Sequence, residues 1–288
     1  MRKRLLIGLY SLLIVSLIGC DEETAIAYVD YEPKIVIEGY IENEAPARVL
    51  LTKSAAFSHA LDSIYLLKHV IQSAKVSVSN GQESEILTLG VDQNYFPPYV
   101  YSGEKIKGEP GKTYHLRIEY DEKVITATTV IPESIVQIND CWATEQDAQN
   151  GSLNVNFYNT GDTDLYYQTA TRIVQTEKSF TICLYGNFPS GNFLSGELVP
   201  MTLNRGLNVN HSSDYFSEFC RGDVVEIRLR TMYQDSYDFW VSWENEILNA
   251  MNPIFPAHTN LNSNIKSPDA IGIWAGYGTS YYRYLVDY

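Results

Sequence analysis

Short runs in which apolar and polar residues alternate, separated by turn residues, constrain this chain more than any other feature. Residues 33–132 hold several such runs; in one, Ile35, Ile37 and Ile41 alternate with charged neighbours. A period of two places successive side chains on opposite faces of a β-strand. Asn80-Gly81 between two runs is a strong hairpin signal. About 100 residues with strands at this spacing predict an immunoglobulin-like β-sandwich.

Residues 133–288 predict a second, β-rich domain that begins after Pro132. The alternation is clearest where Val225, Ile227 and Leu229 are interleaved with charged residues. The expected fold class is therefore mainly β, with a sandwich followed by a less regular β domain.

One helix interrupts the β pattern near residues 236–251. Tyr237, Trp240 and Ile247 recur at helical spacing, while Asp235 can cap the start and Asn252-Pro253 stops the end. An aromatic stripe with this period usually marks burial, so we expect the helix to pack on the sheet of the second domain, in preference to a ligand-stacking role for its tryptophans.

The first nineteen residues have the plan of a secretory signal peptide. Three basic residues precede a mostly apolar run over residues 5–18, which ends in Leu17-Ile18-Gly19-Cys20. This ending resembles the lipobox of bacterial lipoproteins and predicts lipidation of Cys20. The alternative is a transmembrane anchor, but the run is shorter than the roughly 20 residues that span a bilayer.

Residues 20–32 follow as an acidic tether without periodicity. Asp21-Glu22-Glu23 looks like the surface-export signal of lipoproteins in the Bacteroidetes group; the alternative is an ordinary solvated tether. Together these features predict an outer-membrane, lipid-anchored and surface-exposed protein.

Charge excludes two classes of partner. Cleavage before Cys20 leaves 288 − 19 = 269 residues and takes the basic count from 21 to 18 against 35 acidic residues, for a net charge near −17. A charge of that sign repels nucleic acid and anionic lipid headgroups. We therefore expect no nucleic-acid partner and attachment to the membrane only through the lipid.

The cysteines and histidines suggest neither a metal site nor a catalytic site. Three cysteines remain beside Cys20, and we favour a disulfide between Cys183 and Cys220; the alternative is three buried free thiols, including Cys141. The five histidines are isolated, and motifs for a serine nucleophile or a phosphate-binding loop are missing. We expect no enzymatic activity, no metal and no cofactor.

Tyrosine is unusually frequent, at 22 residues. Tyr95, Phe96, Tyr99 and Tyr101 surround Pro97-Pro98, which keeps them out of a central strand, so they are the candidate patch for binding a ligand or partner. The alternative is that these rings serve packing.

A possible modification site lies in the poorly patterned stretch that follows the second predicted strand. Asp62-Ser63-Ile64 resembles the acceptor triplet of the general O-glycosylation system in the Bacteroidetes. Ser63 would then carry a bulky polar group on a loop.

Several segments in fixed order resemble one family. They are Lys34 to Ile41, Ser73 to Val78, Gly111 to Leu116, Tyr237 through Trp240, and Ile271-Gly272-Ile273-Trp274-Ala275-Gly276-Tyr277. The order and spacing are similar to the DUF4249 lipoproteins of the Bacteroidetes. That resemblance brings no catalytic residues. It implies an accessory role beside a TonB-dependent receptor in nutrient uptake. The alternative function is a free-standing carbohydrate-binding or adhesion lipoprotein, which the tyrosine clusters would serve. A glycan or a peptide is the ligand we consider for either role.

Overall fold

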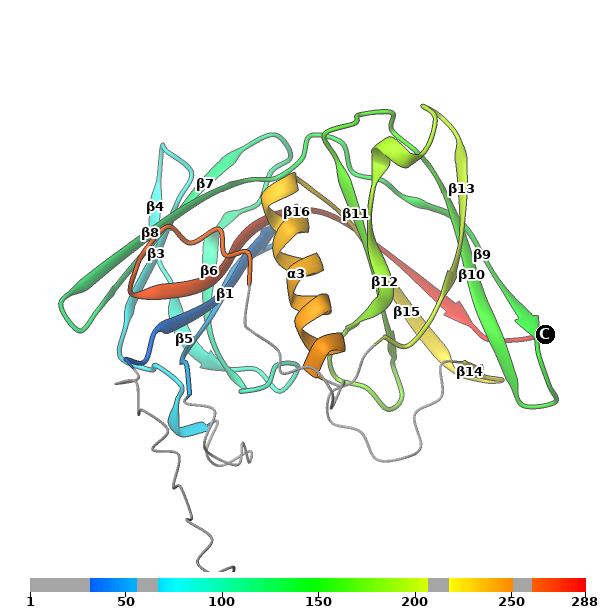
Figure 1. Ribbon diagram of the computed structural model, residues 1–288, viewed down its shortest axis with the longest axis horizontal. Coiled ribbons are helices and arrows are strands. Elements are labelled where there is room, and N and C mark those ends of the chain that lie inside the picture. Colours follow the sequence, from blue (N-terminus) through cyan, green and yellow to red (C-terminus); the bar gives the residue numbers. More distant parts are fainter. Residues whose placement is uncertain (1–31, 56–66, 207–217, 251–260) are drawn as a thin grey trace, which may run out of the picture. The chain divides into compact units, whose positions relative to one another are not determined.

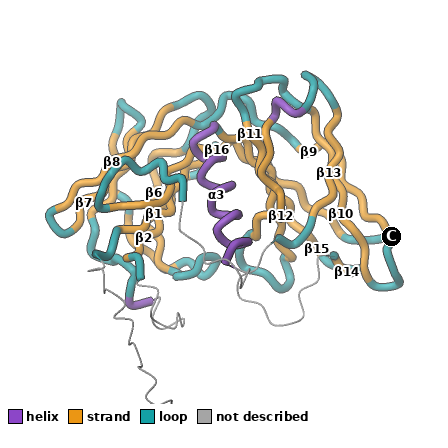
Figure 2. The backbone as a smooth tube through the Cα atoms, in the orientation of Figure 1, coloured by secondary structure: helices purple, strands orange, loops and turns teal. Residues whose placement is uncertain are grey.

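One eight-stranded sheet runs through both halves of the protein, and each half pairs it with a smaller sheet (Figure 1). The structure is a computed structural model that describes residues 32–55, 67–206, 218–250 and 261–288. Residues 33–288 form a single compact unit. In this described part, strands dominate and one long helix packs against them (Figure 2), which confirms the mainly β class.

The first half is an immunoglobulin-like sandwich. Its part of the large sheet has the order β1 (Ile35–Glu42), β2 (Pro46–Lys53), β6 (Tyr99–Lys107), β5 (Thr88–Val91). The facing sheet has the order β4 (Ser84–Ile86), β3 (Lys75–Ser79), β7 (Thr113–Tyr120), β8 (Lys123–Val130). This is the strand order of the immunoglobulin fold, whose first, second, fifth and fourth main strands share one sheet.

The alternating residues fill the core of this sandwich as predicted. Ile35, Ile37 and Ile41 from the large sheet meet Val76 and Val78 from the smaller one in a single buried cluster. The Asn80-Gly81 hairpin is also confirmed, since these residues join β3 to β4 and the Asn80 side chain accepts hydrogen bonds from two backbone N–H groups of the turn.

A tyrosine corner closes the same sandwich. The Tyr114 hydroxyl donates a hydrogen bond to the Lys107 carbonyl, 3.1 Å away, and accepts one from the Glu109 N–H at 2.7 Å. The ring is fully buried at the start of β7, so one side chain ties the end of β6 to the next strand. Immunoglobulin-type sandwiches carry this device at the same corner.

The second half is another two-sheet sandwich. Its part of the large sheet has the order β12 (Thr181–Pro189), β11 (Tyr166–Ile173), β15 (Val224–Met232), β16 (Ala270–Leu285). The facing sheet consists of β13 (Leu198–Leu203), β10 (Asn150–Tyr158), β14 (Phe219–Cys220) and β9 (Ile138–Glu145), and the short 3-10 helix η1 (Ser190–Asn192) follows β12. Buried residues from both sheets form its core.

The last strand joins the two halves. In β16, residues 270–277 pair in parallel with β1, and residues 278–285 pair antiparallel with β15. Trp274 is fully buried in the core of the first sandwich, where its indole N–H donates to the Tyr114 carbonyl at 3.1 Å. Gly272 has φ +129°, and a Cβ there would lie 1.9 Å from the Ile37 carbonyl oxygen, so this close pairing requires glycine. The predicted boundary at residue 132 stays a prediction, but the sheet continues across it.

The predicted helix is confirmed as α3 (Gln234–Ala250), which lies in front of the large sheet in Figure 1. Phe239 and Trp240 are buried in one cluster with Met232, Ile273 and Tyr277 of the sheet. The burial interpretation of Trp240 is therefore confirmed. The structure also shows contact with the partly buried Tyr40 of the first half, so α3 covers the junction as well as the second sandwich.

Candidate functional site

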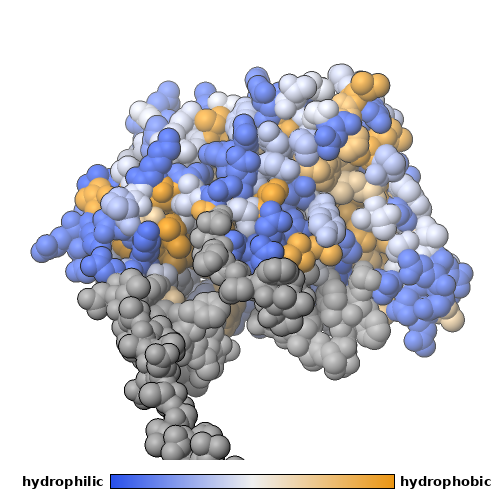
Figure 3. All heavy atoms as spheres, viewed as in Figure 1, coloured by the Kyte–Doolittle hydropathy of each residue, from blue (hydrophilic) through white to orange (hydrophobic). Residues whose placement is uncertain are grey.

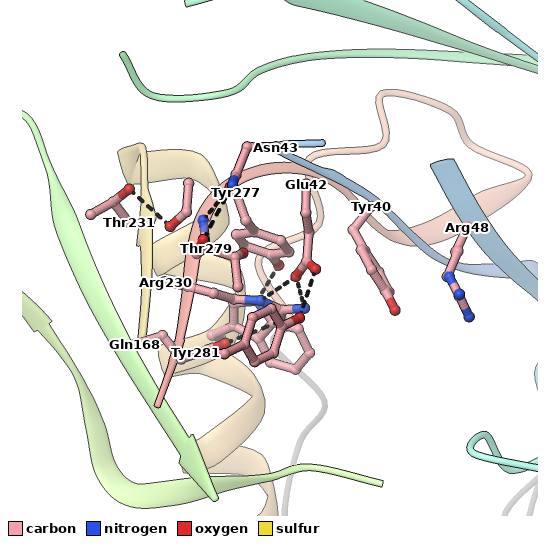
Figure 4. A network of polar contacts seen from close by, with 12 residues as sticks. Tyr40, Glu42, Asn43, Arg48, Gln168, Arg230, Thr231, Tyr277, Thr279 and Tyr281 are labelled. Atoms are coloured by element: carbon pink, nitrogen blue, oxygen red, sulfur yellow. Dashed lines mark hydrogen bonds and ion pairs between the residues drawn. The ribbon is translucent and has the colours of Figure 1, made fainter. Parts of the chain in front are cut away.

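The face of the large sheet that packs against α3, here called the helix face, carries an unusual number of charged side chains. Alternation puts the apolar residues of β1 and β15 into the two cores, so Glu42 of β1 and Arg230 of β15 both turn toward the helix face. The two strands flank β16, and their side chains meet across it (Figure 4).

Glu42 and Arg230 form a buried ion pair between residues that lie 188 positions apart in the chain. The Arg230 Nε donates to Glu42 Oε1 at 2.8 Å, and the side chains are only 4% and 9% exposed for Arg230 and Glu42. Burial acts to raise the pKa of Glu42, but the charges of Arg230 and Arg228 outweigh it and hold that pKa below its ordinary value. The pair is therefore charged at neutral pH.

Aromatic and amide groups complete the bonding of this pair. The Arg230 guanidinium lies 4.1 Å from the ring centroid of Tyr277 and 5.2 Å from that of Tyr40. Gln168 accepts a hydrogen bond from Arg230 at 3.3 Å, and the Tyr281 hydroxyl donates one to Glu42 at 3.1 Å. A buried pair that is satisfied on all sides rigidifies its surroundings but offers no free group for catalysis.

The network reaches α3 through Tyr277. The Trp240 indole N–H donates to the Tyr277 hydroxyl at 2.7 Å. Burial raises the pKa of Tyr277 to about 12, so its hydroxyl stays protonated at neutral pH. One connected set of side chains thus links β1, β15, β16 and the helix.

A second arginine on the same strand is bonded quite differently. Arg228 lies two residues before Arg230, is half-buried, and has no ion pair or hydrogen bond among the described residues. Its guanidinium packs 4.6 Å from the ring centroid of Phe180. Both arginines belong to a run that the sequence marks only as the polar side of a strand.

The four residues of the predicted aromatic patch lie in four different environments. Phe96 is 57% exposed, and Tyr99 is half-buried at the start of β6. Tyr95 is a brace, since its hydroxyl hydrogen-bonds to that of Tyr40 and accepts from Arg48 at 3.1 Å.

The prediction that Tyr101 belongs to an exposed aromatic patch is wrong, because the residue is only 3% exposed. Its hydroxyl donates to the Ile71 carbonyl and accepts from the Ala74 N–H, at 3.0 and 3.1 Å. The reason is that β6 begins directly after the two prolines, and its alternation turns Tyr101 into the sandwich core.

The predicted Cys183–Cys220 disulfide is a second correction, because all three cysteines of the described part are free. Cys183 is buried on β12 in the large sheet and donates to the Asn204 carbonyl at 3.1 Å, whereas Cys220 is exposed on β14 in the smaller sheet. The Cys183 thiol is thus committed to a backbone carbonyl inside the protein, whereas the Cys220 thiol is at the surface. Cys141 is buried as well, so the alternative of three buried thiols is right for two of them.

Two predicted modification sites, Cys20 and Ser63, lie outside the described residues. Within the residues that are described, no group of three or more His, Cys, Asp or Glu side chains could hold a metal ion. Within the same ranges, no helix is both long and apolar enough to cross a bilayer.

A shallow hollow of about 390 Å³ precedes β9 but contains no charged side chain. It is lined by Ile135, Val136, Gln137, Ile138, Asn139, Tyr158 and Thr160. The helix face is therefore the richer candidate site, because several charged and aromatic side chains meet there.

Comparison with known proteins identifies a family but no activity. The family described as "Domain of unknown function (DUF4249)" matches residues 21–283. No curated protein matches the chain.

Solved structures give only distant similarities. Two crystal forms of a cytokine receptor complex, forms 1A and 2, align with TM-scores of 0.24 at 8% identity, covering 70% and 69% of this chain and 86% and 92% of theirs. The chicken CNTN1 FN1-FN3 domains align with a TM-score of 0.21 at 10% identity, covering 69% of this chain and 62% of theirs. At such low TM-scores the alignments do not support any inference about this chain. The assignment of the immunoglobulin-like fold rests on the strand order instead.

Proposed function

The chain belongs to the DUF4249 family, and we propose that it is a lipid-anchored, surface-exposed outer-membrane protein. In this proposal it acts as the accessory binding partner of a TonB-dependent receptor in nutrient uptake. The family description names no activity, so the proposal rests on the residues of this chain. The signal sequence that ends at Cys20 supports the anchor. The acidic charge supports recognition of a protein or small ligand rather than of a polyanion.

The observation that carries the binding role is the braced loop between β5 and β6. Val91, the last residue of β5, and Phe96 on the loop are 65% and 57% exposed. Beneath them, Arg48 forms an ion pair with Asp92 at 2.9 Å and also donates to the Tyr95 hydroxyl. The loop is therefore held in place while its apolar side chains face solvent.

A braced loop loses less conformational entropy on binding than a free one. Large aromatic side chains are enriched at the centres of protein interfaces, and a few of them carry most of the binding energy. On the side shown in Figure 3, hydrophobic residues form small groups among hydrophilic ones. A compact apolar tip on a polar surface suits a partner with a matching pocket.

The test is affinity isolation of the protein from detergent-solubilised native membranes, comparing wild type with Phe96→Ala. We expect a TonB-dependent receptor to co-purify with wild type, and the variant to lose about 2 kcal/mol of affinity, roughly 30-fold, with the fold intact. The matched control is Tyr158→Ala, which truncates an aromatic residue that is 55% exposed on β10. It should leave co-purification unchanged.

Three outcomes contradict parts of this proposal. Equal co-purification with wild type and Phe96→Ala would place the interface elsewhere. Recovery of wild type in the soluble fraction would contradict the lipid anchor. A failure to recover any receptor, combined with specific binding on a glycan array, would support the carbohydrate-binding alternative instead.

A further inference from the structure

Arg228 carries a charge that forms no direct ion pair with any described carboxylate. Its Nε is buried without a hydrogen-bond acceptor, and its two Nη atoms, which are not buried, bond to no described residue. Burial and the neighbouring Arg230 lower the pKa of Arg228. A buried Nε without an acceptor is uncommon, since buried polar groups are normally hydrogen-bonded.

Aromatic groups shape the surroundings of this guanidinium. The Phe180 ring lies near two guanidinium groups, with its centroid 4.6 Å from Arg228 and 4.8 Å from Arg172. The Tyr281 ring centroid is 5.8 Å from that of Phe180, and Tyr281 is 53% exposed. A ligand that reached Arg228 would find two partly exposed rings beside it.

The four strands nearest Arg228 carry a small excess of positive charge on the helix face, although the protein as a whole is strongly acidic. On β1, β11, β15 and β16 this face carries four arginines (Arg172, Arg228, Arg230, Arg283) and three glutamates (Glu38, Glu42, Glu226), so 4 − 3 = +1 against −14 for the whole chain.

Most of these charges are already bonded. Glu42 holds Arg230, while Glu226 holds both Arg172 and Arg283. Glu38 is exposed and within electrostatic reach of Arg228, but it forms no ion pair with it. Arg228 is therefore the positive group that this arrangement leaves open.

We propose that Arg228, flanked by Phe180 and Tyr281, is a binding site for the carboxylate group of a ligand that carries an apolar part next to that group. The planar guanidinium presents paired N–H donors that match the two oxygens of a carboxylate. The rings would cover the apolar part. The strong net negative charge of the chain disfavours polyanions, so a single carboxylate fits better than a nucleic acid or a phosphate-rich surface.

This site goes beyond the receptor-binding role and does not depend on it, because it lies on the helix face whereas the receptor proposal rests on the β5–β6 loop. The probe is benzoate, which combines a carboxylate with a flat ring, titrated into the mature protein and followed by NMR. Benzamide serves as the neutral isostere, and inorganic phosphate as a competing anion. We expect benzoate to bind at least ten-fold more tightly than benzamide, and phosphate not to displace it at equal concentration.

The variant is Arg228→Gln, which removes the charge but keeps a polar side chain of similar reach. We expect it to lose benzoate binding by at least ten-fold. The matched control is Arg221→Gln, because Arg221 also packs on an aromatic ring, 5.5 Å from the centroid of Tyr288, but belongs to the turn between β14 and β15. That control should bind benzoate as wild type does.

The fold of each variant is checked by its melting temperature. Arg228→Gln should melt at or above the wild-type temperature, since it removes an uncompensated charge. Equal binding of benzoate by wild type and Arg228→Gln would overturn the proposal, as would equal binding of benzamide and benzoate or displacement by phosphate. None of these results bears on whether a receptor co-purifies.

Discussion

Two arginines on one strand, Arg230 and Arg228, face the same side of the sheet but are surrounded in opposite ways. Arg230 is enclosed by the Glu42 carboxylate, the Gln168 amide and two aromatic rings, so its charge is paired within the chain. Arg228 packs on a ring and bonds to no described acceptor. The same residue type thus serves to hold the protein together at one position and to leave a charge available at the other.

The difference follows from what lies opposite each arginine. Arg230 pairs in register with Thr279, and β1 on the far side of that strand brings Glu42 within reach. Arg228 pairs with Tyr281, whose hydroxyl is already bonded to Glu42. Both oxygens of Glu42 are thus taken, by Arg230 and by Tyr281, and Arg228 forms no ion pair with a described carboxylate.

The largest expected effect is on stability and separates the two arginines directly. Arg230→Met should lower the free energy of unfolding by about 3–5 kcal/mol, because Glu42 is left as a buried charge without a partner. The matched control, Arg228→Met, should change it by less than about 1 kcal/mol. Urea denaturation of both variants measures the contrast, and equal losses would contradict the assignment of different roles.

The double variant Glu42→Leu with Arg230→Met sharpens this result. It removes both charges at once and so leaves none of them buried and unpaired. It should therefore be more stable than Arg230→Met alone. A loss equal to that of the single variant would mean that packing around Arg230, rather than the charge of Glu42, determines the effect.

The second effect is a pH dependence carried by Glu42. Its folded-state pKa lies below the unfolded value of about 4.3, so its contribution to stability is present above that pH and is lost as pH falls through the folded-state pKa. The loss should not exceed that of Arg230→Met, since protonation weakens the same pair. Comparing the pH profiles of wild type and Glu42→Gln isolates this step; identical profile shapes below about pH 4.3 would contradict it.

The smallest effect concerns the hydroxyl at the edge of the network. Tyr281→Phe removes a hydrogen bond to the Glu42 carboxylate and should cost about 1 kcal/mol, because the ring remains half-exposed and solvent replaces part of the bond. Tyr282→Phe is the control: its side chain turns to the core of the second sandwich, and its hydroxyl bonds to no described residue. If both variants were equally destabilised, the hydroxyl of Tyr281 would have no special role.

The local parts of the fold could be predicted from sequence, because alternation and turn chemistry act between neighbouring residues. Ile35, Ile37 and Ile41 indicate the buried face of β1, and Asn80-Gly81 indicates the hairpin between β3 and β4. The aromatic spacing of Tyr237 and Trp240 indicated α3.

The site itself could not be predicted in the same way. Glu42 and Arg230 each look like the solvent side of an alternating strand, and only the position of β16 between β1 and β15 brings them together. The two prolines predict that Tyr101 lies on an exposed loop, whereas strand β6 begins directly after them and turns Tyr101 into the core. A turn signal such as Pro97-Pro98 predicts the position of a loop, but it does not predict where the next strand begins.

The position of β16 also sets an order of events during synthesis. Domains fold as their residues emerge, from the N-terminus onward. The first sandwich, however, obtains the neighbour of β1 and its central Trp274 only from residues 270–277, near the end of the chain. Until residues 270–277 have been synthesised, β1 is an open sheet edge able to pair with another strand. The sheet of the first half is therefore completed only after nearly the whole chain is available.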